Sequence, residues 1–367
     1  MKIVHVAPYY PPHLGGMETL TRQIAERTAA AGLDVRVVTS ALPRRPAVPD
    51  GVSVSRCAAF EFARTPVIPG LVPRLLRLPP DAVVHLHVAQ PLVPELVRWG
   101  GAVRRFPFIA HLHLDIGPSG PLGCLLPLYK RLLLAPVLRA AAAVVVYTPG
   151  YARLVAEAHG VAAERIEVIP AGVEPPPSGD SWRGEERLLF VGRLCRQKNI
   201  PLLLEAVHLL VRRGRPTTLR IVGEGEERER LQRLVAALKL EDRVVFAGRL
   251  EGAALSREYG SAAALALPSE RESFGIVLIE AMSHGTPAVA TDIPGVRDVI
   301  ADGRTGLLAA PEPRSFAGAL EAVLADRGLW ARLSAAGRVE AARYDWPRIV
   351  ARYVALYERV AAAGRTP

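Results

Sequence analysis

Short, nearly all-apolar runs alternate with helical patterns along this chain, and that alternation limits its fold more than any other feature. Continuous apolar strands are typical of parallel sheets that helices cover on both faces. The runs in the first half are residues 3–7, 34–39, 82–87, 108–113 and 144–148. The runs in the second half are residues 188–191, 219–222, 244–247, 264–267, 288–290 and 306–308. Helical periodicity lies between them, so the sequence predicts an α/β chain with two doubly wound, Rossmann-like parallel sheets.

A stretch rich in proline and polar residues, 174–180, separates the two alternations. Such a stretch cannot extend a central strand, and 367 residues fit two domains. We expect an N-terminal domain at residues 1–174, a linker at 175–184 and a C-terminal domain at 185–345. The last segment, 346–367, is largely an amphipathic helix, which we expect to pack back on the N-terminal domain.

The composition is that of a globular protein without a membrane span. The longest apolar run, residues 132–147, is interrupted by Arg139 and is too short for a bilayer. The first strand begins directly at the N-terminus, without the sections of a secretory signal, so we expect a cytoplasmic protein. The three cysteines are odd in number and lack metal-ligand spacing, which argues against a disulfide framework or a zinc site.

The formal net charge of +10 favours anionic partners such as nucleotide phosphates, nucleic acids or acidic lipid headgroups. Aromatic residues make up only 6% of the chain, which argues against nucleic acid, because single-strand binders interleave aromatic and basic side chains. Only four of the 46 basic residues are lysines, a composition typical of GC-rich coding sequences. The arginine excess is therefore a weak functional signal.

The segment 268–285 follows an apolar strand and carries the strongest functional signal. Its helix is expected to begin near Phe274 and Gly275, where unpaired N–H groups and the helix dipole favour phosphate. Glu272 precedes this helix and Glu280 lies about two turns later, so the two carboxylates cannot share one position. They suit hydroxyl groups at opposite ends of an elongated ligand, with a sugar at one end and a ribose at the other. The alternative is a helix-start acid and a solvated helix residue.

A second motif, from Phe190 to Asn199, also follows a strand and precedes a helix. Its loop contains Arg193 and Lys198, whose guanidinium and ammonium groups can neutralise a diphosphate leaving group. The alternative is that both are ordinary surface residues. Their position beside the motif at Glu272 favours the diphosphate interpretation.

Paired glycines, Gly15 and Gly16, form a third motif between the first strand and the first helix. Glycine permits a close approach of the backbone to a ligand, although a tight turn without a ligand fits the same residues. The spacing is not Gly-x-Gly-x-x-Gly, so the sequence does not indicate a dinucleotide fingerprint.

Four histidines lie near the ends of two expected strands: His85, His87, His111 and His113. Alternation places His111 and His113 on the same side of their strand, so one can reach a ligand while the other is structural. A satisfied core histidine is the alternative for each. We expect no metal, because acid or cysteine ligands at matching spacing are missing from the sequence.

Together these motifs resemble those of the family-four group of retaining GT-B glycosyltransferases, also called glycosyl transferases group 1. The matching residues follow the family's order over nearly the whole chain: Gly15-Gly16-Met17-Glu18, His113, Ile169-Pro170-Ala171-Gly172-Val173, Val191-Gly192-Arg193, Lys198-Asn199, Glu272-Ser273-Phe274-Gly275 and Glu280. The resemblance implies a GT-B fold, in which two doubly wound domains face each other across a cleft. The N-terminal domain (1–174) would then bind the acceptor, and the C-terminal domain (185–345) the nucleotide sugar. Ala171 stands where the family commonly has asparagine, which affects the contacts expected of that loop.

The resemblance also implies a role for each motif. Arg193 and Lys198 would hold the donor diphosphate, Glu272 the transferred sugar and Glu280 the ribose, and Gly16 would approach the phosphates. The other residues expected at the donor are Gly15, Arg249, Leu250, Ser273, Phe274, Gly275 and Ile276.

The acceptor side is less well specified. His113 would line the sugar near the acceptor, and we count it with Arg193, Lys198 and Glu272 as the expected catalytic residues. The stretch 111–120 departs from the family and is assigned to acceptor recognition. In the family, the anomeric configuration is retained, and neither a metal nor a cofactor beyond the nucleotide diphosphate sugar is expected.

The sequence therefore predicts a retaining hexosyltransferase that uses a UDP- or GDP-linked sugar and a hydroxyl acceptor. One candidate acceptor is a small aminocyclitol or other secondary metabolite, because GC-rich coding suits an antibiotic-producing bacterium. Another is a lipid or cell-envelope glycan reached by weak contact with a membrane surface, because residues 73–77 and 125–139 combine apolar and basic side chains. Ordinary core-packing helices are the favoured interpretation of both stretches. An alternative of another class is a non-catalytic nucleotide-sugar binder.

Overall fold

The chain forms two compact units in the computed structural model. The first unit is Met1–Pro170 together with Pro347–Pro367, and the second is Ala171–Trp346. The described residues are 1–13, 15–42, 51–62, 65–113, 123–174, 176, 182 and 184–364. Most of the expected linker at 175–184, and residues 114–120 of the stretch assigned to the acceptor, therefore lie outside the described residues.

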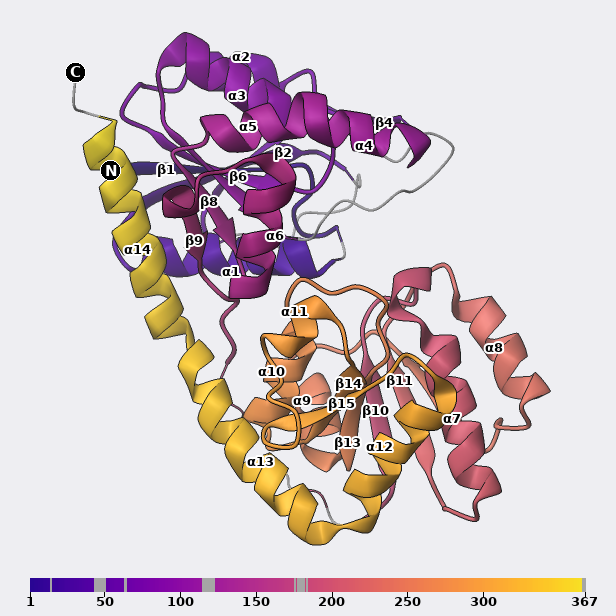
Figure 1. The fold of residues 1–367 in the computed structure, drawn as a ribbon. Coiled ribbons are helices and arrows are strands. Elements are labelled where there is room, and N and C mark those ends of the chain that lie inside the picture. The colour runs from indigo at the N-terminus through magenta and orange to yellow at the C-terminus, as the bar shows by residue number, and fades with distance from the viewer. Residues whose placement is uncertain are drawn as a thin grey trace. The chain divides into compact units, whose positions relative to one another are not determined.

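The first unit is built on a seven-stranded parallel sheet with the order β3-β2-β1-β6-β7-β8-β9 (Figure 1). Its strands are β1 (Lys2–Ala7), β2 (Asp34–Ser40), β3 (Ser53–Cys57), β6 (Val83–Val88), β7 (Phe108–Leu112), β8 (Ala143–Val146) and β9 (Ile166–Val168), beside a separate antiparallel pair, β4 (Phe60–Phe62) and β5 (Thr65–Val67). Its α-helices are α1 (Gly16–Ala30), α2 (Leu71–Leu76), α3 (Val93–Arg104), α4 (Leu126–Tyr129), α5 (Ala135–Ala140), α6 (Pro149–His159) and α14 (Trp346–Ala363), with a π-helical turn (Lys130–Leu134) between α4 and α5.

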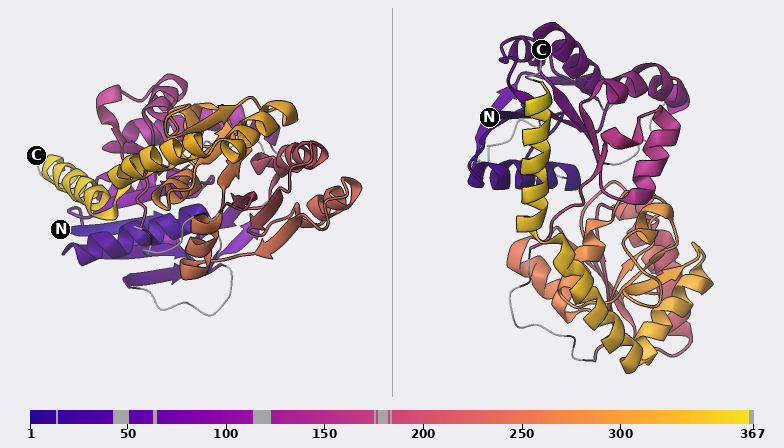
Figure 2. Two further views of the ribbon diagram at one scale, coloured as in Figure 1. Left: turned by 90° about the horizontal axis from the view of Figure 1, so that it is seen from below. Right: turned by 60° about the vertical axis from the view of Figure 1, so that its left-hand side comes forward.

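The two faces of this sheet differ in chemistry. One face is apolar and packs against α2, α3, α5 and α6 in a single hydrophobic cluster that includes Val84, Leu86 and Val97. The opposite face carries buried histidines, and α1 and α14 lie along it (Figures 1 and 2). Because side chains alternate along a strand, the apolar and histidine positions of one strand fall on opposite faces.

The second unit has a six-stranded parallel sheet with the order β12-β11-β10-β13-β14-β15. The strands are β10 (Arg187–Val191), β11 (Thr218–Val222), β12 (Val244–Gly248), β13 (Ala264–Leu267), β14 (Ala288–Thr291) and β15 (Gly306–Ala309). The helices are α7 (Ile200–Arg212), α8 (Arg228–Ala237), α9 (Gly252–Ser261), α10 (Ile276–Ser283), α11 (Pro294–Arg297), α12 (Pro313–Ala325) and α13 (Arg327–Ala341). Helices α7, α8 and α12 cover one face, and α9 and α10 pack on the other side (Figure 1).

The expected strands all form, each within two residues of its expected bounds. Four strands of the first unit were not expected, namely β3, β4, β5 and β9. Each lacks the continuous buried run that marks a central strand, since β4 is exposed and β3 and β9 are mostly half-buried edge strands. Apolar periodicity therefore identifies the sheet centre better than its edges.

No helix among the described residues is long and apolar enough to cross a membrane. The three cysteines are free thiols: Cys57 is buried, Cys195 is half-buried and Cys124 is exposed. The cytoplasmic location stays a prediction.

Candidate donor site

The strand order of the second sheet reverses between β10 and β13. Open α/β sheets bind ligands at such a point, beyond the carboxyl ends of the two strands. The loop after β10 carries Lys198 at the end of a short 3-10 turn, and the loop after β13 carries Glu272. The topology thus brings together two residues that are 74 positions apart in the sequence.

Lys198 and Glu272 form an ion pair in which Lys198 Nζ donates to Glu272 Oε1. Ser269 Oγ donates to the same carboxylate oxygen at 2.9 Å. The exposed fractions of the two charged side chains are 18% and 9%, so little water screens the pair. An ammonium and a carboxylate held at the reversal point can meet an anionic phosphate and a sugar hydroxyl respectively.

Contacts from the next strand hold the Glu272 loop in place. Thr291, at the end of β14, donates its hydroxyl hydrogen to the carbonyl oxygen of Ser269 at 2.5 Å. Gly295, in α11, lies so close that a Cβ atom there would stand 2.0 Å from the carbonyl oxygen of Glu272. Sequence reasoning missed Thr291 and Gly295, because their contacts with this loop arise only when β13 and β14 pair. It also missed Ser269, whose contact with Glu272 is local.

Helix α10 begins at Ile276 behind this loop. Gly275 is its N-cap residue and adopts a left-handed φ of 74°, where a Cβ atom would lie 2.9 Å from Leu278 Cδ1. Glycine is therefore required for the turn. Ser273 and Phe274 are buried just before it. The N-terminal N–H groups of α10 lie directly after the loop that carries Glu272, in a position suited to an anion.

Glu280 lies in α10 and accepts a hydrogen bond from Tyr259 OH at 2.6 Å. Burial raises the pKa of Glu280 above its usual value, and the hydrogen bond from Tyr259 offsets part of that rise. Glu280 is therefore a partnered inward-facing carboxylate and not a solvated helix residue. Its partner, Tyr259, gave no signal in the sequence.

Arg193 does not share a partner with Lys198 in this structure. Its guanidinium donates to Glu226 Oε2 at 3.1 Å, and two-thirds of its side chain is exposed. The backbone of the loop that carries Arg193 packs closely against the loop after β11. A Cβ atom at Gly223, in that second loop, would stand 1.9 Å from the carbonyl oxygen of Gly192. Arg193 is thus an exposed side chain on a closely packed backbone.

Arg249 and Leu250 follow β12, which is two strands away from β10 in the sheet. Arg249 Nε donates to Glu251 Oε1 at 2.6 Å. The structure thus places these two residues at the same end of the sheet as Lys198 but farther from the strand reversal.

In the first unit, Gly15 and Gly16 precede and begin α1. A Cβ atom at Gly15 would lie 2.1 Å from Glu18 Oε2, whereas one at Gly16 would meet no described atom within 4 Å. Glu18 is buried and contacts His13 Nδ1 at 2.8 Å. Gly15 is therefore needed for packing, and Gly16 leaves an open backbone position.

His113 follows β7 and is 9% exposed. Its Nε2 lies 2.7 Å from His87 Nδ1, and its Nδ1 is hydrogen-bonded to Tyr147 OH. Burial lowers the pKa of His113 to about 3, so the ring is neutral at pH 7.

Comparisons with known proteins identify the family of the chain. The family pattern described as "Glycosyl transferases group 1" matches residues 179–340, and "Glycosyl transferase 4-like domain" matches residues 15–172. The chain is 31% identical to the phosphatidyl-myo-inositol mannosyltransferase of Mycobacterium leprae, over 99% of this chain and 98% of that protein. The chain is a group 1 glycosyltransferase. As a member of this group, it is a retaining enzyme that uses a nucleotide-sugar donor.

A second relative agrees with this assignment, and two solved structures show the fold. The D-inositol 3-phosphate glycosyltransferase of Acidothermus cellulolyticus is 30% identical to this glycosyltransferase, over all of this chain and 91% of that protein. Sucrose-phosphate synthase from Thermosynechococcus elongatus has a similar fold, with a TM-score of 0.78, 24% identity and 99% of each chain covered. The Anabaena protein HepE in complex with UDP gives a TM-score of 0.79 at 19% identity, over 98% of this chain and 100% of that one. The glycosyltransferase therefore has the GT-B fold.

Proposed function

We propose that this enzyme transfers a hexose from a nucleotide diphosphate sugar to a hydroxyl group of a cyclitol. The donor half of the proposal depends on the Lys198–Glu272 pair at the strand reversal of the second unit. The acceptor half is supported by two relatives whose names refer to inositol acceptors, one lipid-linked and one phosphorylated. Aminocyclitols belong to the same acceptor class, so an acceptor from secondary metabolism is included in this proposal.

In this proposal, donor binding exchanges internal ion pairs for contacts with the ligand. Lys198 turns from Glu272 to the donor diphosphate, and the freed carboxylate accepts hydrogen bonds from hydroxyl groups of the transferred sugar. Arg193 leaves Glu226, an exposed partner that costs little to lose, and adds a second cation to the leaving group. The N–H groups that begin α10 contribute fixed partial positive charge without moving.

We assign the ribose hydroxyl groups to Glu280 and the base side of the site to Arg249 and Leu250. In the first unit, Gly16 is the backbone position proposed to approach the donor phosphates, since it carries no packing contact at its Cβ position. His113 is proposed for the acceptor side, because it follows β7 and keeps some exposure.

The proposed role of Glu280 predicts a pH effect. Ribose binding by an ionised carboxylate strengthens as the pH rises through the pKa of Glu280, which burial has raised. Tyr259→Phe removes the hydrogen bond that lowers this pKa, so the acidic limb of donor kcat/KM is expected to move to higher pH. Donor kcat/KM measured against pH checks this shift. Glu280→Gln, which cannot ionise, should lose the limb, and an unchanged profile in both variants would contradict the assignment.

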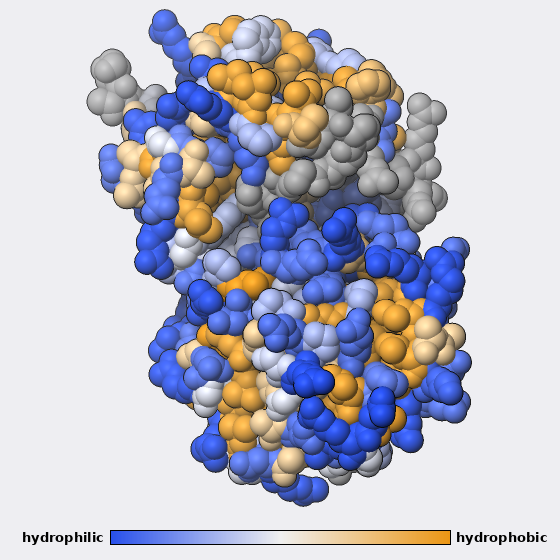
Figure 3. Space-filling view, turned by 45° about the vertical axis from the view of Figure 1, so that its right-hand side comes forward, coloured by the Kyte–Doolittle hydropathy of each residue, from blue (hydrophilic) through white to orange (hydrophobic). Residues whose placement is uncertain are grey.

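A lipid-linked cyclitol is the second candidate acceptor, and an apolar surface of the first unit favours it. Figure 3 shows apolar side chains gathered over this unit at the top of the view. Leu128 and Leu132 are 55% and 57% exposed on α4 and the following π-helical turn, with Leu125 and Leu133 beside them. Arg131, in the same turn, can meet an acidic headgroup.

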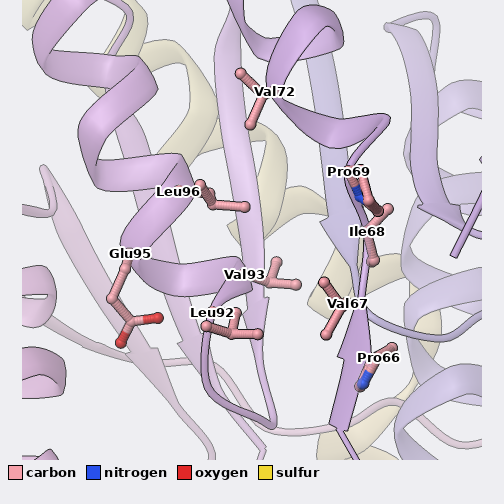
Figure 4. A pocket seen from close by; sticks show the side chains of 9 residues that line it. All are labelled: Pro66, Val67, Ile68, Pro69, Val72, Leu92, Val93, Glu95 and Leu96. Carbon is pink, nitrogen blue, oxygen red and sulfur yellow. The ribbon is translucent and has the colours of Figure 1, made fainter. Parts of the chain in front are cut away.

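An apolar pocket of about 220 Å³ lies nearby in the same unit, between β5 and α3. In Figure 4, the side chains of Val67 and Ile68 face those of Val93 and Leu96, and the carboxylate of Glu95 turns aside from them. A pocket of this lining suits an alkyl chain better than a polyol.

Leu132→Glu separates the two acceptor candidates. On vesicles of inositol phospholipid, the substitution should lower co-sedimentation by about tenfold, because it places a charge in the apolar contact. Val339→Glu, at a still more exposed apolar residue of the second unit, should leave sedimentation unchanged. If the wild-type chain does not sediment with these vesicles, the lipid candidate is wrong.

The acceptor class is tested by incubating the enzyme with UDP- and GDP-hexoses and three acceptors: inositol phosphate, an aminocyclitol and inositol phospholipid vesicles. Mass spectrometry should detect one glycosylated cyclitol product. Donor turnover without any such product would contradict the cyclitol proposal while leaving the donor site standing.

A further inference from the structure

Five buried histidines gather on one face of the first sheet. The strand register pairs His5 of β1 with His85 of β6, and His87 of β6 with His111 of β7. His113 lies two positions after His111 and therefore on the same side. Four of the rings have no exposed surface, and His113 keeps 9%.

The rings are linked by their nitrogen atoms. His87 Nε2 lies 2.9 Å from His5 Nδ1, and His87 Nδ1 lies 2.7 Å from His113 Nε2. His111 Nδ1 lies 3.1 Å from His85 Nε2. Buried imidazole nitrogens usually have partners, yet His111 Nε2 has no hydrogen-bond partner among the described residues.

We propose that His87, His111 and His113 bind one divalent transition-metal ion of the zinc class. The structure assigns His87 Nδ1, His111 Nε2 and His113 Nε2 as the ligand atoms. One ring nitrogen from each of these residues lies within 4.8 Å of the other two. Three neutral imidazoles with a fourth position for solvent form a common zinc-binding set.

The other nitrogen of each ligand ring is already held. His87 Nε2 meets His5, His111 Nδ1 meets His85, and His113 Nδ1 meets Tyr147 OH. Metal-binding histidines almost always use their second nitrogen in this way, which fixes the tautomer and aims the lone pair at the metal. The array thus supplies both the ligands and the groups that orient them.

The spacing of the proposed ligand atoms is close to that of a zinc site. Two ligands at a tetrahedral zinc ion lie about 3.4 Å apart, given Zn–N distances of about 2.0–2.1 Å. His87 Nδ1 and His113 Nε2 need to separate only slightly to reach that spacing.

A second grouping, His5, His85 and His87, lies deeper in the sheet. It lacks a member with exposed surface, whereas His113 gives the proposed site contact with solvent. The sequence alone argued against a metal because His111 and His113 lacked a third ligand at matching spacing. Pairing of β6 with β7 supplies that ligand, His87, from 24 positions earlier in the chain.

The proposed metal site lies in the first unit and includes His113, which is also the residue proposed for the acceptor side, whereas the proposed donor residues Lys198 and Glu272 lie in the second. The test uses the full chain without a histidine tag, stripped by a chelator and titrated with Co²⁺ and then Zn²⁺. We expect one ion per chain, tetrahedral Co²⁺ absorption bands in the visible range, and a higher Tm with Zn²⁺. Absence of bound metal after dialysis would overturn the proposal.

Three substitutions test which residues bind the ion. His111→Gln should weaken Co²⁺ binding by at least about 100-fold. Tyr147→Phe, which removes the hydroxyl group at the second nitrogen of His113, should weaken it by about 10- to 100-fold. His208→Gln, at a histidine of the second unit that contacts a backbone carbonyl, should bind like the wild type. Equal binding by His111→Gln and the wild type would overturn the site.

If His111→Gln does not fold, the ligands of the ion can still be identified in the wild-type chain. X-ray absorption of the Zn²⁺-loaded wild type should show three imidazole ligands at the metal. One imidazole or none would mean surface binding and would overturn the proposal.

Discussion

Lys198→Ala is expected to lower kcat/KM for donor turnover by about 100- to 1,000-fold, because the variant loses the cation proposed to neutralise the departing diphosphate. Glu272→Ala is expected to lose activity to a similar extent, since the sugar hydroxyl groups lose their acceptor. Both rates are measured as release of nucleoside diphosphate in the presence of acceptor.

The same two loops provide matched controls. Arg196 and Glu270 are exposed charged residues within two positions of Lys198 and Glu272, and Arg196→Ala and Glu270→Ala should keep near wild-type rates. Removal of one partner leaves the other charge partly buried, so circular dichroism and Tm must accompany each rate. A folded Lys198→Ala or Glu272→Ala variant with wild-type transfer would show that the site is wrongly assigned.

Gly295→Ala is expected to destabilise the second unit by about 3 kcal/mol and to abolish most donor binding. The new Cβ atom would stand 2.0 Å from the carbonyl oxygen of Glu272, so the loop that carries this carboxylate has to move. Thermal unfolding and titration with the nucleotide sugar measure the two effects.

Gly318→Ala makes the same chemical change where space is open. Gly318 lies in α12, and a Cβ atom there would meet nothing within 4 Å. Alanine in a helix interior is favoured over glycine by about 1 kcal/mol, so this control should raise Tm slightly and leave donor binding unchanged. Wild-type donor affinity in Gly295→Ala would contradict the role of this contact.

Much of the fold and part of the donor site could be predicted from residue patterns. The strands around Lys198 and Glu272 are continuous buried runs, which identify parallel strands, and both residues stand just beyond strand ends, where such sheets bind ligands. Helix α7 lies between β10 and β11, where helical periodicity was expected.

Contacts set by the pairing of strands were not predictable. Gly295 gave no signal, because nothing local distinguishes it from a glycine that only makes a turn. The partner of Arg193 was also unexpected, since a long exposed side chain takes whichever carboxylate the fold brings near, and here that is Glu226. The histidine array required the register of β1, β6 and β7, which alternation within one strand cannot supply.

A thermal-shift panel of nucleotide diphosphate sugars tests the central claim most directly. At least one UDP- or GDP-linked sugar is predicted to raise the Tm of the wild type, because a ligand that binds only the folded state stabilises it. The shift should persist in Arg196→Ala and disappear in Lys198→Ala. Equal shifts in the wild type and Lys198→Ala, or no shift with any nucleotide sugar, would contradict a donor site built on Lys198 and Glu272.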